Sequence, residues 1–338
     1  MSFAASPLWV NGSVILVVIA VIGVGAYWIV ESAVRIAGRL GVSELVIGLT
    51  VIALGTSAPE FAVTLIAAFR GHADISVSNI VGSNIFNLGF ILGGCALVCA
   101  IPTDRTLLRR DGAVLGLSTL LLLGMIGWDL RLDWYDGVAL LAVLGVYVVA
   151  LYQRRHASVE STERAMASGG AEAGDDRVPG AAAGAALARA PWFGDALLLL
   201  VGLAAVVAGS HVLVEVATAV ARDFGVSEWL IGVTIVAAGT SAPELATSLT
   251  GAIRGRYAIS AGSVIGSDIF NLLGVLGLAG VLRTLTIDPV SRISLAALAM
   301  MVFLVLYFMR TDWRISRMEG LVLVAVAMAR WGFAFATN

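Results

Sequence analysis

Long uninterrupted runs of apolar residues constrain this chain more than any other feature. They are about 17 to 28 residues long, enough for a helix to cross roughly 30 Å of hydrocarbon. The runs predict ten membrane-spanning helices, at residues 12–36, 43–69, 74–100, 112–128, 136–152, 194–221, 227–253, 260–282, 292–309 and 318–335. Only 13% of the residues are charged, which excludes an ordinary soluble domain. The net charge of −2 gives no indication of a nucleic-acid partner.

A polar stretch at residues 153–190 divides the apolar spans into two groups of five. It is rich in alanine, glycine and charged residues and has little to bury, so we expect a flexible linker. The sequence therefore predicts a first domain at 1–152, the linker at 153–190 and a second domain at 191–338.

The two domains repeat each other in sequence. A shift of 184 residues aligns residues 41–60 with 225–244, and 14 of these 20 positions are identical. The same shift aligns Gly82–Asn87 with Gly266–Asn271. Because five spans per half is an odd number, the second half must enter the membrane in the opposite orientation. The predicted fold is an all-α membrane protein of two inverted five-helix repeats, a design found in secondary transporters.

The arginines favour one orientation of the chain. With the N-terminus outside, fifteen arginines fall at cytoplasmic ends and loops and six fall outside, as the positive-inside rule requires. The linker is then cytoplasmic. The first residues lack the basic region of a cleaved signal, so we expect the first span to be retained in the cell (inner) membrane.

Two glutamates, Glu60 and Glu244, lie near the middle of predicted spans. A carboxylate there costs several kcal/mol unless it is protonated, paired or bound to a cation. The central parts of the predicted spans contain no lysine or arginine that could pair with it. A cation site is the favoured interpretation, and a neutral carboxyl group that hydrogen-bonds between helices is the alternative.

Each glutamate ends a Gly-Thr-Ser-Ala-Pro-Glu hexapeptide whose other members also carry oxygen. The threonine and serine precede the glutamate by four and three residues, so we expect both hydroxyls on its helical face. The proline lacks an N–H, which frees backbone carbonyls one turn earlier and predicts a broken helix at the midplane. The candidate ligands are the hydroxyls of Thr56, Ser57, Thr240 and Ser241 and the carbonyls around Ala53, Leu54, Ala237 and Ala238. An all-oxygen set favours a hard cation such as Na⁺ or Ca²⁺.

The second repeated block adds serine and asparagine side chains, four residues apart on one helical face. These candidates are Ser83 and Asn87 in the first half and Ser267 and Asn271 in the second. Hydrogen bonding between helices is the alternative role for them. Asp268 is the one asymmetric acid, aligned with Asn84. It lies about 100° round the helix from Ser267, which places it at the edge of the site or on a water path.

Glu31 and Glu215 also correspond in the repeat, but both lie near span ends that water can reach. Arg35, four residues after Glu31, can pair with it. We interpret both acids as structural, with gating as the alternative.

The paired hexapeptides, followed by Gly-Ser-Asn-Ile-Phe-Asn and Gly-Ser-Asp-Ile-Phe-Asn, resemble the alpha repeats of prokaryotic sodium/calcium exchangers, in the calcium/cation antiporter superfamily. The resemblance covers essentially the whole chain, with the repeats at 41–94 and 225–278. It implies a transporter and not an enzyme, with no cofactor, Ca²⁺ and Na⁺ as transported ions, and Glu60 and Glu244 as the central acids. Of the candidate carbonyls, the resemblance implies those of Ala53 and Ala237. Potassium-dependent relatives often carry aspartate at the position of Asn271, so the resemblance implies potassium-independent exchange. We also expect a monomer in the lipid bilayer.

Three mechanisms are compatible with these residues. Electrogenic Na⁺/Ca²⁺ antiport by alternating access is the leading hypothesis, because shared oxygens make occupancy exclusive. The first alternative is a Ca²⁺/H⁺ antiporter on the same fold, with the two glutamates cycling between protonated and Ca²⁺-bound forms. The second is a cation channel, which an inverted repeat with broken helices argues against.

Overall fold

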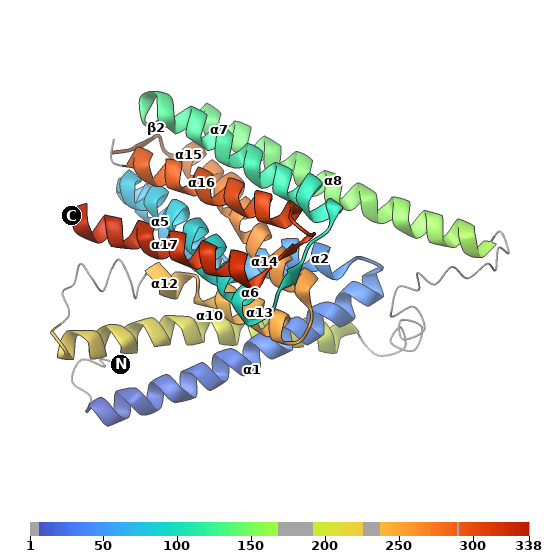
Figure 1. Cartoon of the computed structure of the whole chain (residues 1–338), viewed down its shortest axis with the longest axis horizontal. Helices are drawn as coiled ribbons and strands as arrows, with labels where there is room; N and C mark the ends of the chain where they lie inside the picture. The colour runs from blue at the N-terminus through green and yellow to red at the C-terminus, as the bar shows by residue number, and fades with distance from the viewer. Residues whose placement is uncertain (1–6, 168–191, 226–236, 289–290, 338) are drawn as a thin grey trace.

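The computed structural model describes residues 7–167, 192–225, 237–288 and 291–337, and these residues are almost entirely helical (Figure 1). The helical segments of the first half are α1 (Leu8–Leu40), α2 (Glu44–Ile47), η2 (Gly48–Ile52), α3 (Ala53–Thr56), α4 (Ala58–Arg70), α5 (Ala73–Phe86), η3 (Asn87–Leu92), α6 (Gly93–Val98), η4 (Leu107–Gly112), α7 (Ala113–Asp129) and α8 (Trp134–Ala167). Those of the second half are α10 (Trp192–Asp223), α12 (Ala237–Thr240), α13 (Ala242–Ile253), α14 (Tyr257–Ile269), η6 (Phe270–Val275), α15 (Leu276–Leu282), α16 (Ser291–Arg310) and α17 (Arg317–Thr337). The η segments are π-helical.

Seven of the described helices are long and apolar enough to cross a membrane, and an eighth span results if the bent pair 44–56 and 58–70 is counted as one. In the described part of the chain the predicted spans fall on helical segments, except at Ser57 and Ser241 and at one or two residues of some span ends. The first part of the predicted span 227–253 lies outside the described residues. The protein is therefore a multi-pass helical membrane protein.

Helix α8 extends well beyond the predicted end of its span. We expected a linker to begin at residue 153, whereas the helix continues to Ala167. The reason is local, because residues 153–167 contain alanine, arginine and glutamate, which favour helix, and no glycine or proline. The rest of the predicted linker, 168–190, lies outside the described residues.

Helices α1 and α10 form a pair that lies along one side of the molecule (Figure 1). Glycines allow their backbones to approach closely: a Cβ added at Gly202 would lie 2.8 Å from the carbonyl oxygen of Gly25. Around this contact, Ile22, Ile29 and Val206 belong to a small hydrophobic cluster separate from the main core. We call α1 and α10 the α1–α10 pair and the remaining helices the core bundle.

The centre of the core bundle is formed by the segments 75–98 and 257–282, which have 72% and 78% of their apolar windows buried. They carry the second repeated block in each half. Both change from α-helix to π-helix within that block, at Asn87 in the first half and at Phe270, one residue before Asn271, in the second. A π-helical turn inserts an extra residue per turn and is common at functional sites.

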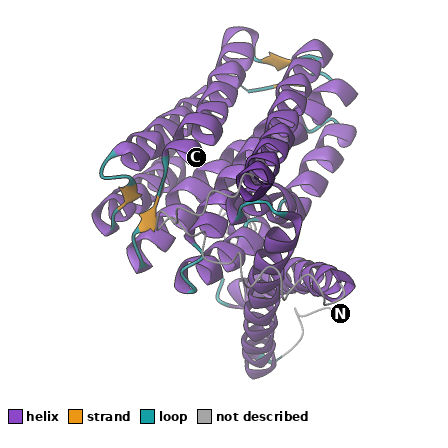
Figure 2. Cartoon of the chain, turned by 90° about the vertical axis from the view of Figure 1, so that its right-hand side faces the viewer, coloured by secondary structure: helices purple, strands orange, loops and turns teal. Residues whose placement is uncertain are grey.

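Two short antiparallel strand pairs join the halves (Figure 2). Strand β1 (Ile101–Pro102) pairs with β4 (Arg314–Ile315), and β2 (Arg131–Leu132) pairs with β3 (Leu285–Thr286). The 184-residue shift carries β1 onto β3 and carries β2 to within one residue of β4. The two pairings are therefore equivalent contacts, and they lie at opposite ends of α7.

Repeat-related glycines differ in their surroundings, which gives a matched test of the packing. A Cβ at Gly266 would lie 2.5 Å from the carbonyl oxygen of Leu49, whereas a Cβ at Gly82 would meet nothing within 4 Å. We expect Gly266→Ala to destabilise the protein by about 1–3 kcal/mol through overpacking. We expect Gly82→Ala to be neutral or to stabilise its helix by up to about 1 kcal/mol. Thermal unfolding of the two variants in detergent measures the difference, and equal melting temperatures would contradict the described contact between α14 and η2.

Candidate cation-binding site

The two hexapeptides break their helices at the same residue. Ser57 stands between α3 and α4 with ψ 6°, and Ser241 stands between α12 and α13 with ψ 8°, so neither serine is helical. A proline in the first turn of the following helix accounts for the break, because its ring cannot follow a continuous helix. In the first half the two parts are bent by 49°. The predicted broken helix is present in both halves.

The break places each glutamate in the first turn of a new helix. Glu60 is in the first turn of α4 and Glu244 in the first turn of α13, and both are completely buried. The N-terminal end of a helix carries a partial positive charge that stabilises a carboxylate. The two carboxyl groups belong to one buried cluster, because each accepts a hydrogen bond from the serine of the other motif. Neither has an ion pair with a basic side chain among the described residues.

The serine hydroxyls cross between the halves, which differs from the expectation of one helical face. Ser57 Oγ donates to Glu244 Oε1 at 3.1 Å, and Ser241 Oγ donates to Glu60 Oε1 at 2.9 Å. The physical reason is the helix break, since the rule for residues three and four apart requires a continuous helix. Each carboxylate is therefore completed by the motif of the other half.

The remaining members of the hexapeptides surround the same two carboxylates. Thr56 lies near Glu244 and Thr240 lies near Glu60. The Thr56 hydroxyl also donates to the carbonyl of Ile52 at 3.0 Å. The carbonyl of Ala53 accepts from the backbone N–H of Ser57 at 3.0 Å. Ala237 lies in α12, four residues before Ser241.

The second repeated block closes the site from the centre of the bundle. Ser267 Oγ lies 2.7 Å from Ser57 Oγ and donates to Glu244 Oε1 at 3.2 Å. Asn87 Nδ2 donates to Asp268 Oδ1 at 2.9 Å and reaches Ser267 Oγ at 3.5 Å. Asp268 is completely buried, and the hydrogen bond from Asn87 joins its side chain to the edge of this cluster.

Two further members complete the block. Asn271 Nδ2 donates to Asn84 Oδ1 at 3.1 Å. Ser83 is buried, and no hydrogen bond from it to either glutamate is found in the described part of the chain.

Several polar residues that support the site were not among the predicted ligands. Asn84 connects the halves, because its amide also donates to the carbonyl of Asp268 at 3.1 Å. Asn79 holds α5 to α4 through Thr64 Oγ1 at 3.0 Å, and the repeat-related Ser263 and Ser248 make the equivalent contact at 2.9 Å. The 184-residue alignment could have identified them, since it places polar residues on polar residues at these positions.

Five buried oxygens at this site have no hydrogen-bond donor among the described residues. They are Glu60 Oε2, Glu244 Oε2, Asp268 Oδ2, Asn87 Oδ1 and Asn271 Oδ1. An orphaned buried acceptor costs free energy unless a donor or a cation satisfies it. No group of three or more His, Cys, Asp and Glu side chains suited to a metal occurs in the described residues. The unsatisfied carboxylate and amide oxygens are the ligand types that a hard cation prefers.

Comparison with known proteins identifies the family of this chain. The family model described as sodium/calcium exchanger protein matches residues 11–153 and 195–329. The chain belongs to the sodium/calcium exchanger family. Among its relatives, the sodium/calcium exchanger MaX1 of Methanosarcina acetivorans is 31% identical, over 95% of this chain and 97% of that protein. The inner membrane protein YrbG of Escherichia coli is 32% identical, over 90% of this chain and 91% of that protein.

A solved structure shares the fold of this family member. The sodium-calcium exchanger NCX_Mj, from crystals soaked with Na⁺ and Sr²⁺, matches with a TM-score of 0.76 and 29% identity. The match covers 98% of this chain and 100% of that chain.

The orphaned oxygens lead to a direct binding prediction. We expect Ca²⁺ to raise the melting temperature of the purified protein, because a ligand at about 100 times its Kd stabilises the folded state by roughly 2.7 kcal/mol. Glu60→Gln and Glu244→Gln should each abolish most of this shift, while the exposed Asp312→Asn should retain it. Equal Ca²⁺ protection in all four proteins would place the binding site elsewhere.

Proposed function

We propose that this protein is a secondary active antiporter that exchanges Na⁺ for Ca²⁺ by alternating access. The observation that carries the proposal is the set of five orphaned oxygens around Glu60 and Glu244, in a chain of the exchanger family. Two carboxylates balance one Ca²⁺, and the same oxygens suit Na⁺. One site that serves both ions can hold only one kind at a time, and this exclusion couples the two fluxes.

The proposed ligand set consists of the two glutamates and the oxygens that surround them. It comprises Glu60, Glu244, Thr56, Ser57, Thr240, Ser241, Ser83, Asn87, Ser267 and Asn271, with the carbonyls of Ala53 and Ala237 and with Asp268 at the edge. The hydrogen bonds that cross between Ser57 and Glu244 and between Ser241 and Glu60 support it, because one bound ion would then contact both halves. Each chain contains a complete set, so we propose that the monomer is the functional unit.

We propose ten spans arranged as two inverted five-helix repeats, at 1–152 and 191–338, joined by a cytoplasmic segment. The equivalent strand pairs at opposite ends of α7 and the equivalent helix breaks support the inversion. The distribution of arginines supports an outside N-terminus in the inner membrane. The α1–α10 pair, which packs as a unit on one side of the core bundle, is then the element that slides to open either face.

Na⁺-driven Ca²⁺ uptake tests this function. In proteoliposomes loaded with Na⁺, we expect radiolabelled Ca²⁺ uptake to collapse when the Na⁺ gradient is removed. Glu60→Gln and Glu244→Gln should each lower the uptake rate at least tenfold, because each removes one of the two charges that balance Ca²⁺. Uptake driven by a pH gradient without Na⁺ would favour the Ca²⁺/H⁺ antiporter, and downhill Ca²⁺ flux without any counter-ion would favour a channel.

Exchange should also be electrogenic and independent of K⁺. If three Na⁺ leave for each Ca²⁺ that enters, one net charge moves per cycle, worth about 2.3 kcal/mol per 100 mV. An inside-positive potential imposed on the vesicles should therefore accelerate Ca²⁺ uptake, and an inside-negative potential should slow it. Replacing K⁺ by choline should leave the rate unchanged, because Asn271 lacks the charge of an aspartate. A rate insensitive to potential would indicate electroneutral exchange.

A further inference from the structure

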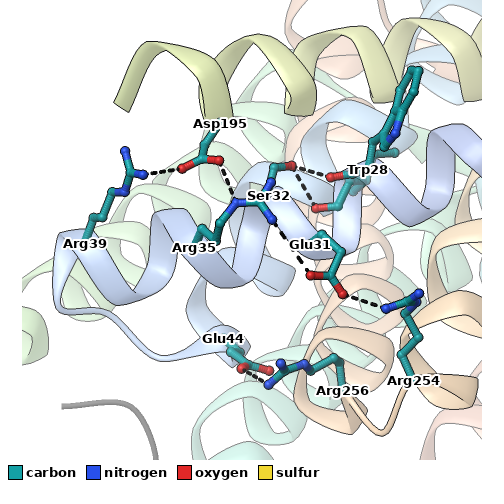
Figure 3. A network of polar contacts seen from close by, with 10 residues as sticks. Trp28, Glu31, Ser32, Arg35, Arg39, Glu44, Asp195, Arg254 and Arg256 are labelled. Atoms are coloured by element: carbon teal, nitrogen blue, oxygen red, sulfur yellow. Dashed lines mark hydrogen bonds and ion pairs between the residues drawn. The ribbon is translucent and has the colours of Figure 1, made fainter. Parts of the chain in front are cut away.

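A network of charged side chains joins the α1–α10 pair to the core bundle at one end of α1 (Figure 3). Arg254, the residue after α13, places Nη1 2.7 Å from Glu31 Oε1 on α1. The same guanidinium lies over the ring of Tyr27, 4.0 Å from its centroid. Because α13 begins with the turn that carries Glu244, this contact links the α1–α10 pair to a helix of the cation site.

Other ion pairs in the network connect different bodies. Asp195 of α10 lies 2.6 Å from Arg35 Nε and 2.7 Å from Arg39 Nη2, both on α1. These pairs fasten α1 to α10, so the two helices can move as one body. Arg256 and Glu44 form a pair at 3.0 Å inside the core bundle. Of the ion pairs drawn in Figure 3, the one between Glu31 and Arg254 therefore joins the two bodies.

The sequence repeat places the same two charges at the other end of the pair. The shift of 184 residues carries Glu31 onto Glu215 of α10 and Arg254 onto Arg70, the last residue of α4. Helix α4 begins with the turn that carries Glu60, so Arg70 stands in the same relation to the site as Arg254. The corresponding position to Tyr27 is His211.

In the structure this second set of charges is apart. Glu215 Oε1 lies 3.3 Å from Nε2 of His211 on its own helix, and its side chain is 48% exposed. Arg70 is also exposed, and no ion pair between Glu215 and Arg70 occurs among the described residues. Equivalent charges are therefore joined at one end of the α1–α10 pair and separated at the other.

We propose that Glu31 with Arg254 and Glu215 with Arg70 are two alternating ionic latches, one closed while the other is open. The proposal rests on the alternating access of the proposed function. In an inverted repeat, a movement that exchanges the conformations of the two halves must exchange these contacts as well. Partly exposed ion pairs are weak, so replacing one by the other leaves both states accessible. In the proposed orientation, the closed latch of this structure lies at the cytoplasmic face.

Charge reversal tests the latch that is open in the structure. In the Na⁺-driven uptake assay, we expect Arg70→Glu to slow exchange several-fold, because it would oppose closure against Glu215. The double variant Arg70→Glu/Glu215→Arg should recover most of the rate, since it restores the attraction with reversed signs. Arg131→Glu, another exposed arginine on the same proposed face, is the matched control and should leave the rate unchanged. If Arg70→Glu matches this control, or if the double variant is no faster than the single one, the latch is refuted.

Cross-linking tests the alternation without any transport. Cysteines replace Glu31, Arg254, Glu215 and Arg70 in one chain, in a background with Cys95→Ala and Cys99→Ala, and a short bifunctional thiol reagent joins each pair. Single-pair variants identify the two cross-linked products by mass spectrometry. We expect a preformed link between positions 31 and 254 to lower the yield of the link between 70 and 215 several-fold.

The two assays separate failure of the latch from failure of the proposed function. Independent cross-link yields with normal Na⁺-driven uptake would refute the latch and leave the exchange intact. Mutually exclusive cross-links without Na⁺-driven uptake in the wild-type chain would support the latch and refute Na⁺ as the driving ion.

Discussion

The burial of two carboxyl groups, Glu60 and Glu244, is the constraint on which the rest of the candidate site depends. Glu60 and Glu244 are completely buried and lack basic partners among the described residues, in an environment where an uncompensated charge is costly. Helix N-termini and serine hydroxyls reduce that cost, but one oxygen of each carboxylate still has no described donor. A buried acceptor without a hydrogen-bond donor destabilises the folded state if its role is only structural. It is favourable as a binding site, because a cation gains the interactions that the protein does not supply.

The same constraint explains why the helices are broken at the site. A continuous helix would direct each serine to the glutamate of its own motif and would place no helix N-terminus at the carboxylate. The breaks at Ser57 and Ser241 have the opposite effect. Each break starts a new helix at the glutamate, and each serine donates a hydrogen bond to the glutamate of the other half. Charge compensation and contact between the halves thus have one structural cause. An ion in the proposed site would contact both halves, which is the coupling that the proposed alternating access requires.

Much of this site could be predicted from the sequence because the relevant signals are local or repeated. The length of an apolar run indicates a membrane-spanning helix, and a carboxylate in the middle of such a run indicates a functional site. The repeat identified both motifs at once. The crossing of Ser57 to Glu244 could not be predicted, because spacing along one helix says nothing about how two halves interlock. The alignment placed Asn84 opposite Asp268, but it could not show that the Asn84 amide donates to the Asp268 carbonyl across the halves, because that contact depends on the tertiary packing.

The repeat is nearly invariant at the site and diverges toward the ends of the α1–α10 pair, and both properties follow from the function proposed. A bound ion has no preferred direction, so the two motifs that surround it can remain identical. The two membrane faces differ, so the ends are free to differ: Asp195 and Arg35, which fasten α1 to α10 at one end, correspond to Asn11 and Ala219 at the other. The ion-paired Asp195 fastens α1 to α10 at one end and lies outside the candidate site. In the proposed carrier, differences at the ends would bias which face is open, while the two identical hexapeptides would offer the ion the same oxygen types from both halves.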